Sequence, residues 1–159
     1  MTGRLAGGAL VLGAALWTAL SALRQRRRET ELLEQLSAAL EDMASRIRWQ
    51  RSTLPETIAA QRRYPLAGVY FRDVSALLTQ DVPLRNAWHQ AFAPLPVGGE
   101  VLAALELSGD EEKLTGSLLY AAARLKERCV CRRAEQRQKA KLWLSGALCL
   151  AGLLVILLM

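Results

Sequence analysis

Hydrophobic and charged positions divide the chain into three parts. No side chain from Leu5 to Leu23, or from Leu142 to Met159, carries a charge, and most of these residues are apolar. As α-helices the two stretches would be about 28 and 27 Å long, close to the roughly 30 Å hydrocarbon core of a bilayer. The pattern predicts a transmembrane helix in residues 1–23, a middle domain in residues 24–141, and a second transmembrane helix in residues 142–159.

The first apolar stretch has an alternative interpretation as a cleaved signal peptide. Arg4 precedes it, and Ala19-Leu20-Ser21 roughly suits a cleavage site. Against this, four arginines follow at once, and a basic cluster in that place resists translocation. The charge bias therefore favours a retained helix.

The first part of the middle domain has helical periodicity. Apolar residues recur there at steps of three and four, namely Leu32, Leu33, Leu36, Leu40, Met43 and Ile47. These positions predict a helix from the arginine cluster to about Arg51. Thr53-Leu54-Pro55-Glu56 then offers a capping box for a short second helix, which Tyr64-Pro65 should end.

Further helices are expected across the rest of the domain. A third carries Val69, Tyr70, Val74, Leu77 and Leu78, and a fourth carries Leu84, Ala87, Trp88 and Ala91, with Asp81 as its cap and Pro83 in its first turn. We expect a loop at residues 94–99 and a fifth helix at residues 100–107. A last helix should begin near Asp110 and continue into the second apolar stretch. The predicted fold is all-α: an antiparallel bundle of about six helices flanked by two transmembrane helices.

The charge of the chain is unevenly distributed. The net charge is +6 and the isoelectric point about 9.7, but the basic excess lies at the two ends of the middle domain. We call these positions the basic collar: Arg24, Arg26, Arg27, Arg28, Arg132, Arg133, Arg137, Lys139 and Lys141. The positive-inside rule places such a collar, and the domain between its halves, in the cytosol of a protein that crosses the membrane twice. Anionic lipid is then an expected partner, at about 1 kcal/mol for each basic residue.

The body between the two halves of the collar is net acidic, which argues against nucleic acid as a partner. Catalytic patterns are also absent from the sequence. His89 is the only histidine, Cys129 and Cys131 would point about 200° apart on a helix, and no phosphate-binding loop or nucleophile motif occurs. We therefore expect no enzyme activity, no cofactor and no metal.

Small residues recur four positions apart in both apolar stretches. The pairs are Gly3 with Gly7, Ala9 with Gly13, and Ala147 with Ala151. Small residues on one helix face let helices approach closely within a membrane. They permit pairing of the two spans, or of neighbouring copies in a homo-oligomer.

The order of several short elements resembles the stage III sporulation protein AB family of endospore-forming bacteria. The elements are Leu36–Leu40, Thr53-Leu54-Pro55-Glu56-Thr57, Val82 through Ala87-Trp88, Leu107-Ser108-Gly109-Asp110, and the tail Lys141–Met159 with Gly146 and Gly152. Two features depart from the family pattern: the segment after Gly109 is shorter, and the loop of residues 94–99 is richer in proline and glycine.

The resemblance implies a membrane-anchored platform in the complex that links the mother cell to the forespore. The domain would be similar to the F-type platform domains of type II secretion and type IV pilus machines and would face the mother-cell cytosol. Its implied partners are a secretion-type ATPase and ring-forming membrane proteins of the same complex. Acidic residues near the start of the last helix are the candidate docking face, namely Glu100, Glu106, Asp110, Glu111 and Glu112. The alternative is a platform of a general secretion or pilus system.

Overall fold

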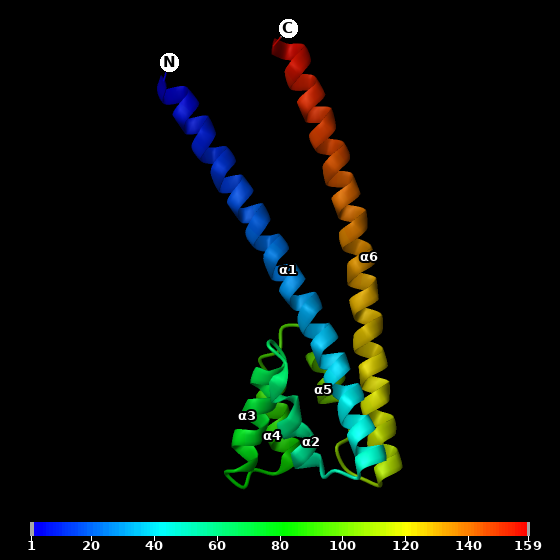
Figure 1. Cartoon of the computed structure of the whole chain (residues 1–159). Helices are drawn as coiled ribbons and strands as arrows, with labels where there is room; N and C mark the ends of the chain where they lie inside the picture. Colours follow the sequence, from blue (N-terminus) through cyan, green and yellow to red (C-terminus); the bar gives the residue numbers. More distant parts are fainter. Residues whose placement is uncertain (1, 159) are drawn as a thin grey trace.

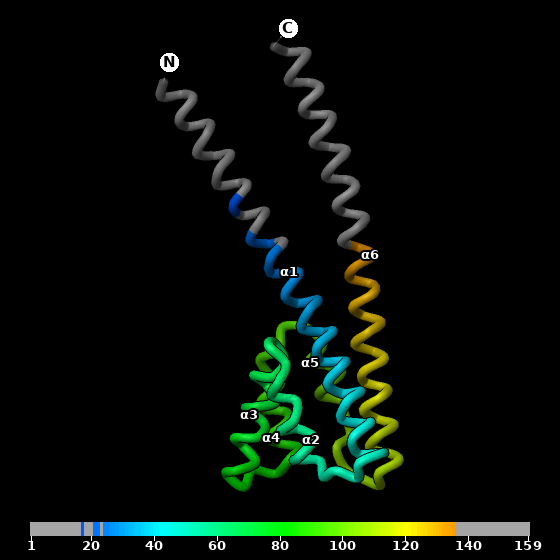
Figure 2. The backbone as a smooth tube through the Cα atoms, in the orientation of Figure 1, coloured from blue at the N-terminus to red at the C-terminus, as the bar shows by residue number. Residues whose placement is uncertain are grey.

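Two long helices pack against each other where the first ends and the second begins, and they carry a group of short helices on one flank (Figure 1). A computed structural model describes the backbone of residues 2–158 and the side chains of residues 17, 21–22 and 24–135 (Figure 2). The long helices are α1 (Thr2–Gln50) and α6 (Glu111–Leu158). They are antiparallel, and α1 makes its most extensive packing contacts with α6.

The prediction of an all-α fold is confirmed for residues 2–158, which form six α-helices and one short 3₁₀-helix without any strand. Among the residues whose side chains the structure describes, no helix is long and apolar enough to cross a membrane. The side chains of the predicted spans, apart from Trp17, Ser21 and Ala22, lie outside the described residues, as do the small-residue pairs.

The two long helices extend without a break into the apolar stretches of the sequence. The predicted first helix began at the arginine cluster, whereas α1 is continuous from Thr2 to Gln50 because nothing between its two parts breaks a helix. The expected continuation of the last helix into the second apolar stretch is confirmed by α6.

Five short helices come between the long ones in the sequence: α2 (Leu54–Ala60), η1 (Gln61–Arg63), α3 (Gly68–Leu78), α4 (Leu84–Phe92) and α5 (Gly99–Ala103). Glu56 caps the start of α2, since its Oε2 accepts a hydrogen bond of 3.0 Å from the Thr53 backbone N–H. The predicted break at Tyr64-Pro65 is confirmed, because Tyr64 is extended and α3 begins four residues later.

Asp81 does not cap α4, so that prediction was wrong. It lies at the end of α3 with a φ of 57°, and Pro83 occupies the position before α4. The Asp81 N–H donates to the Leu78 carbonyl and the Val82 N–H donates to the Leu77 carbonyl, both at 3.3 Å. This pair of bonds is a Schellman motif, in which Asp81 takes the left-handed place that glycine usually holds.

The fifth helix is shorter than the predicted span of residues 100–107. It ends at Ala103, and the chain then crosses irregularly to α6, where Ser117 Oγ lies 2.9 Å from the carbonyl oxygens of both Glu106 and Leu114. Residues 94–98 form a loop, as predicted, but the loop is partly buried. Pro94 and Pro96 are exposed, whereas Leu95 and Val97 join the core and Gly98 lies against Leu33 of α1 and Leu125 of α6.

The core has two connected regions. Leucines of α1 meet Leu118 and Leu125 of α6 in the first. In the second, the rings of Phe71, Trp88 and Phe92 pack between α3 and α4, with ring centres 4.5 to 6.1 Å apart. The buried Trp88 Nε1–H donates a hydrogen bond of 3.0 Å to the Leu102 carbonyl, which joins α4 to α5.

Candidate functional site

Ion pairs cross the α1–α6 interface at three levels. Arg132 lies 2.7 Å from Glu29, Lys126 lies 3.1 Å from Glu41, and Arg133 pairs with Glu34. Each pair joins a base on α6 to an acid on α1. Exposed pairs contribute at most about 1 kcal/mol each, so their main effect is on orientation rather than on stability.

The basic collar falls into groups that differ in their partners. Arg132 and Arg133 are paired with carboxylates of α1. Arg24 and Arg26–Arg28 are exposed and make no ion pair with any described residue. The side chains of Arg137, Lys139 and Lys141 lie outside the described residues.

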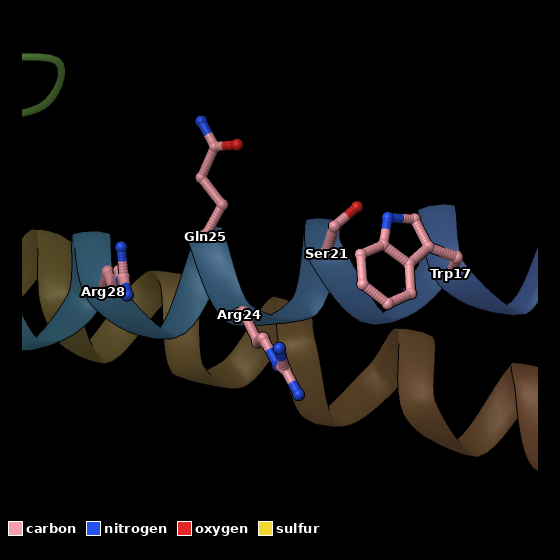
Figure 3. A pocket seen from close by; sticks show the side chains of 5 residues that line it. All are labelled: Trp17, Ser21, Arg24, Gln25 and Arg28. Atoms are coloured by element: carbon pink, nitrogen blue, oxygen red, sulfur yellow. The ribbon is translucent and has the colours of Figure 1, made fainter.

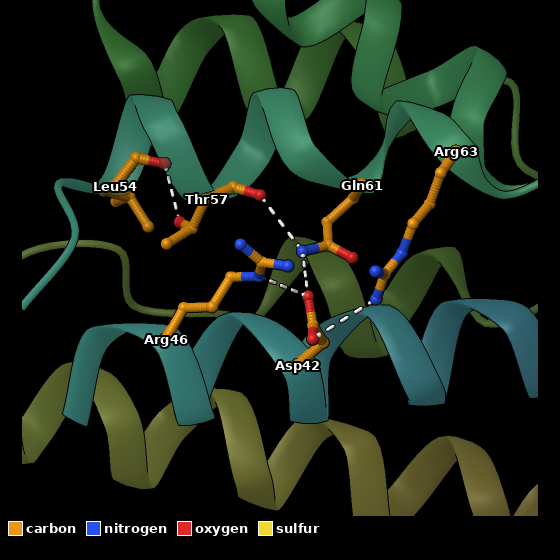
Figure 4. A network of polar contacts seen from close by, with 6 residues as sticks. All are labelled: Asp42, Arg46, Leu54, Thr57, Gln61 and Arg63. Carbon is orange, nitrogen blue, oxygen red and sulfur yellow. Dashed lines mark hydrogen bonds and ion pairs between the residues drawn. The ribbon is translucent and has the colours of Figure 1, made fainter. Parts of the chain in front are cut away.

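Asp42 is the centre of a polar network that attaches α2 and η1 to α1 (Figure 4). Its Oδ2 accepts hydrogen bonds from Arg46 Nε at 2.7 Å and from Gln61 Nε2 at 2.8 Å, and its Oδ1 lies 3.2 Å from Arg63 Nη2. Gln61 Nε2 also donates to the Thr57 carbonyl at 3.1 Å. One carboxylate thus holds three side chains from two parts of the chain.

The environment of Asp42 favours its charged form. Burial alone would raise the pKa of Asp42, but the hydrogen bonds from Gln61 and Arg46 and the charges of Arg63 and Arg46 outweigh burial, so the pKa lies below its usual value. The Gln61 Oε1 atom is buried without a hydrogen-bond partner within the described part of the chain.

Gln35 makes a second attachment to α1. Its Oε1 accepts the backbone N–H groups of Leu66 at 2.8 Å and of Ala67 at 3.2 Å. These donors follow the Tyr64-Pro65 break, where the helical hydrogen-bond ladder has stopped. Gln35 therefore satisfies backbone groups that the break leaves open.

The five candidate docking residues are all exposed, and they lie in two places. Asp110, Glu111 and Glu112 lie at the start of α6, and the bond from Ser117 ties Glu106 close to them. Glu100 lies farther along, where its carboxylate is 3.0 Å from Arg128 Nη2. Arg128 lies 11 positions after Ser117 on α6. Glu100 therefore contacts α6 about 16 Å farther along the helix axis than Glu106 does.

A surface groove runs between these two places. It lies between α5, residues 104–106 and α6, and it combines buried apolar residues such as Leu105 and Ala121 with exposed charged ones. Glu100 and Glu106 both line this groove, as do Arg124 and Arg128. The arrangement offers a partner an apolar surface with charges of both signs at its sides.

The residues considered for catalysis are not brought together. His89 is exposed on α4, and no group of three or more acidic, histidine or cysteine residues in the described part is arranged to hold a metal. Cys131 is exposed, whereas Cys129 is buried. Burial, and then the hydrogen bond and charge of Glu34, raise the pKa of the Cys129 thiol. Cys149 lies outside the described residues.

Sequence reasoning missed the roles of Gln35, Asp42 and Gln61. Glutamine and aspartate on a helix are normally expected to be solvent-exposed, and the hydrogen bonds by which these residues join separate elements span 19 to 32 positions in the sequence. The one available signal was the Tyr64-Pro65 break, which requires some other group to accept the backbone N–H groups that follow it.

The structure defines a class of protein: a small helical domain built on two long antiparallel helices that continue into apolar ends. The sequence model of the stage III sporulation protein AB family matches residues 4–96. This match covers more than half of the chain, so the chain belongs to that family and has a role in sporulation. The elements at residues 107–110 and 141–159 lie outside the match. No curated protein and no solved structure matches the chain.

Proposed function

We propose that the protein is a membrane-anchored platform of the complex between mother cell and forespore, which docks a cytosolic secretion ATPase to ring-forming membrane proteins. Residues 1–23 and 142–159 would cross the membrane around the forespore, and the helical domain would face the mother-cell cytosol. Membership of the sporulation family supports the setting. The uncharged length of both stretches supports the anchoring.

The single observation that carries the platform proposal is the construction of α1 and α6. Each is one continuous helix, and ion pairs at three levels join the two helices side by side. A load applied where α1 ends and α6 begins would pass along both helices without meeting a flexible joint. Such continuity supports a platform that would connect an ATPase to a membrane ring.

The exposed acids at the start of α6 are the proposed contact for the ATPase. They lie at the end of the α1–α6 pair that is farthest from the apolar stretches (Figure 1). Acidic residues in the first turn of a helix also interact favourably with the helix dipole, which gives them a structural role in any case. Binding must therefore be measured separately from folding.

The test is co-purification of the full-length tagged protein from sporulating cells in mild detergent, with mass spectrometry of its partners. We expect a secretion ATPase and ring-forming membrane proteins. Glu106→Lys with Glu112→Lys should reduce recovery of the ATPase, whereas Asp73→Lys with Glu135→Lys, an equal charge change at other exposed acids, should not. Equal recovery with both double variants, at equal helicity, would remove the docking assignment. Recovery of pilins instead would favour a general secretion platform.

A further inference from the structure

A pocket on α1 lies next to the end of the first apolar stretch. The described residues that line it are Trp17, Ser21, Arg24, Gln25 and Arg28 (Figure 3). At 100° per residue, all five fall within about a third of the helix circumference. The pocket therefore belongs to one face of α1.

Three side chains of this face, those of Trp17, Arg24 and Arg28, are exposed. The Trp17 side chain is 74% exposed, although tryptophan is among the most hydrophobic residues. Arg24 and Arg28 are exposed and form no ion pair with a described residue, in contrast to Arg132 and Arg133 of α6. Two arginines and one large ring thus remain available on the same face.

These groups match one ligand chemistry. A guanidinium presents a planar fork of N–H donors that binds phosphate oxygens. The Gln25 side chain points away from that of Arg24 and is not part of the proposed contact (Figure 3). Trp17 lies about 9 Å along the helix before the end of the apolar stretch at Leu23, so its ring would contact the acyl chains of a lipid held at the arginines. Arg24 lies about 10 Å and Arg28 about 16 Å beyond Trp17 along the helix axis, on the side away from the apolar stretch.

We propose that Arg24 and Arg28, beside Trp17, form a binding site for the phosphate headgroup of an anionic phospholipid. The site rests on the proposed membrane anchoring by residues 1–23. This site differs from general attraction of lipid to the basic collar, because it would involve only one face of α1. Arg26 projects about 200° from both Arg24 and Arg28, and neither Arg26 nor Arg27 lines the pocket.

This difference gives a matched pair of variants. Arg24→Gln with Arg28→Gln removes the pocket arginines, and Arg26→Gln with Arg27→Gln removes the same charge from the same helical turns. The full-length protein would be reconstituted in nanodiscs that contain equal amounts of phosphatidylglycerol and phosphatidylcholine. Native mass spectrometry would then count the lipids that each variant retains.

We expect the wild type to retain phosphatidylglycerol selectively. The pocket variant should lose that selectivity by roughly tenfold, and the control variant should keep most of it. Trp17→Leu should weaken retention of both lipids. Equal losses in the two double variants would overturn the site in favour of a non-specific collar. Binding of inorganic phosphate to detergent-solubilised protein, abolished only in the pocket variant, would overturn the assignment to lipid.

Carbonate extraction of membranes separates this inference from the proposed function. If wild type and variants stay in the membrane pellet but show no lipid selectivity, only the lipid site fails. If the wild type itself is extracted from the membrane, the proposed anchoring fails and the lipid site fails with it.

Discussion

Gly98 lies so close to Leu125 that a side chain at position 98 would displace the end of the leucine side chain. A Cβ atom built on Gly98 would be 2.8 Å from Leu125 Cδ2 on α6 and 3.0 Å from Leu33 Cδ2 on α1. Gly98 also has a φ of 83°, a conformation that L-residues adopt at a cost. The glycine before α5 is thus inserted where the two long helices meet.

Gly98→Ala should destabilise the domain by about 2–4 kcal/mol, since it adds backbone strain to overpacking of the core. The measurement is the thermal unfolding midpoint of the detergent-solubilised protein, followed by circular dichroism at 222 nm. Gly116→Ala is the matched control, because nothing lies within 4 Å of a Cβ there and Gly116 is inside α6. That change should stabilise the protein by about 1 kcal/mol. Similar midpoints for the two variants would contradict the packing at Gly98.

Gln35→Ala should destabilise the domain by about 1–3 kcal/mol, because the N–H groups of Leu66 and Ala67 would lose their acceptor. Gln35→Glu keeps an oxygen in the same place and should cost clearly less. Hydrogen exchange at Leu66 and Ala67 gives the most direct measurement. Faster exchange at these two amides in the alanine variant alone is the expected result, and unchanged exchange would show that another group protects them.

Asp81→Gly should stabilise the domain by about 0.5–1 kcal/mol, since glycine adopts the left-handed conformation of this position without strain. The expected readout is a rise of several degrees in the unfolding midpoint. Asp73→Gly, at an exposed position inside α3, should instead lower the midpoint by a similar amount. A lower midpoint for Asp81→Gly would show that the aspartate side chain makes a contribution larger than the strain.

Periodicity predicted the helices that bury a continuous apolar face, and it predicted α6 as far as its entry into the apolar stretch. Short elements were less predictable, because tertiary contacts decide where they end. α5 ends at Ala103 rather than at the expected residue 107, and the left-handed Asp81 closes α3 instead of opening α4. The separation of Glu100 from Glu106 has the same origin, since the sequence does not specify how the chain crosses to α6.

The stability that Asp42 contributes should depend on pH. Its pKa is lower in the folded protein than in the unfolded chain, so the charged carboxylate stabilises the fold above the usual aspartate pKa of about 3.9. That contribution is lost as the pH falls through the lower folded-state value. Wild type should therefore be more stable than Asp42→Asn at pH 7, and the difference should shrink below about pH 4.

Urea unfolding of both proteins between pH 7 and pH 3 measures this difference. Asp73→Asn is a suitable control, because Asp73 is exposed and its carboxylate forms no ion pair within the described residues. The difference in unfolding free energy between Asp73→Asn and wild type should stay small and constant between pH 7 and pH 3. If the difference in unfolding free energy between wild type and Asp42→Asn is the same at every pH, the network stabilises the fold through its hydrogen-bond geometry and not through the charge of the carboxylate.

Cys131 provides a direct test of the proposed orientation. It is exposed on α6, ten residues before Lys141, whereas Cys129 is buried and has a raised thiol pKa. A variant with Cys129→Ala and Cys149→Ala keeps Cys131 as its one thiol. A membrane-impermeant maleimide should fail to label this variant in intact cells and should label it in inside-out vesicles, because the proposed topology places residue 131 in the cytosol.

Labelling of Cys131 in intact cells would reverse the proposed orientation. Equal labelling before and after lysis would contradict a domain enclosed by the membrane. Cys131→Ser in the same background should remove all labelling, which assigns the signal to this residue.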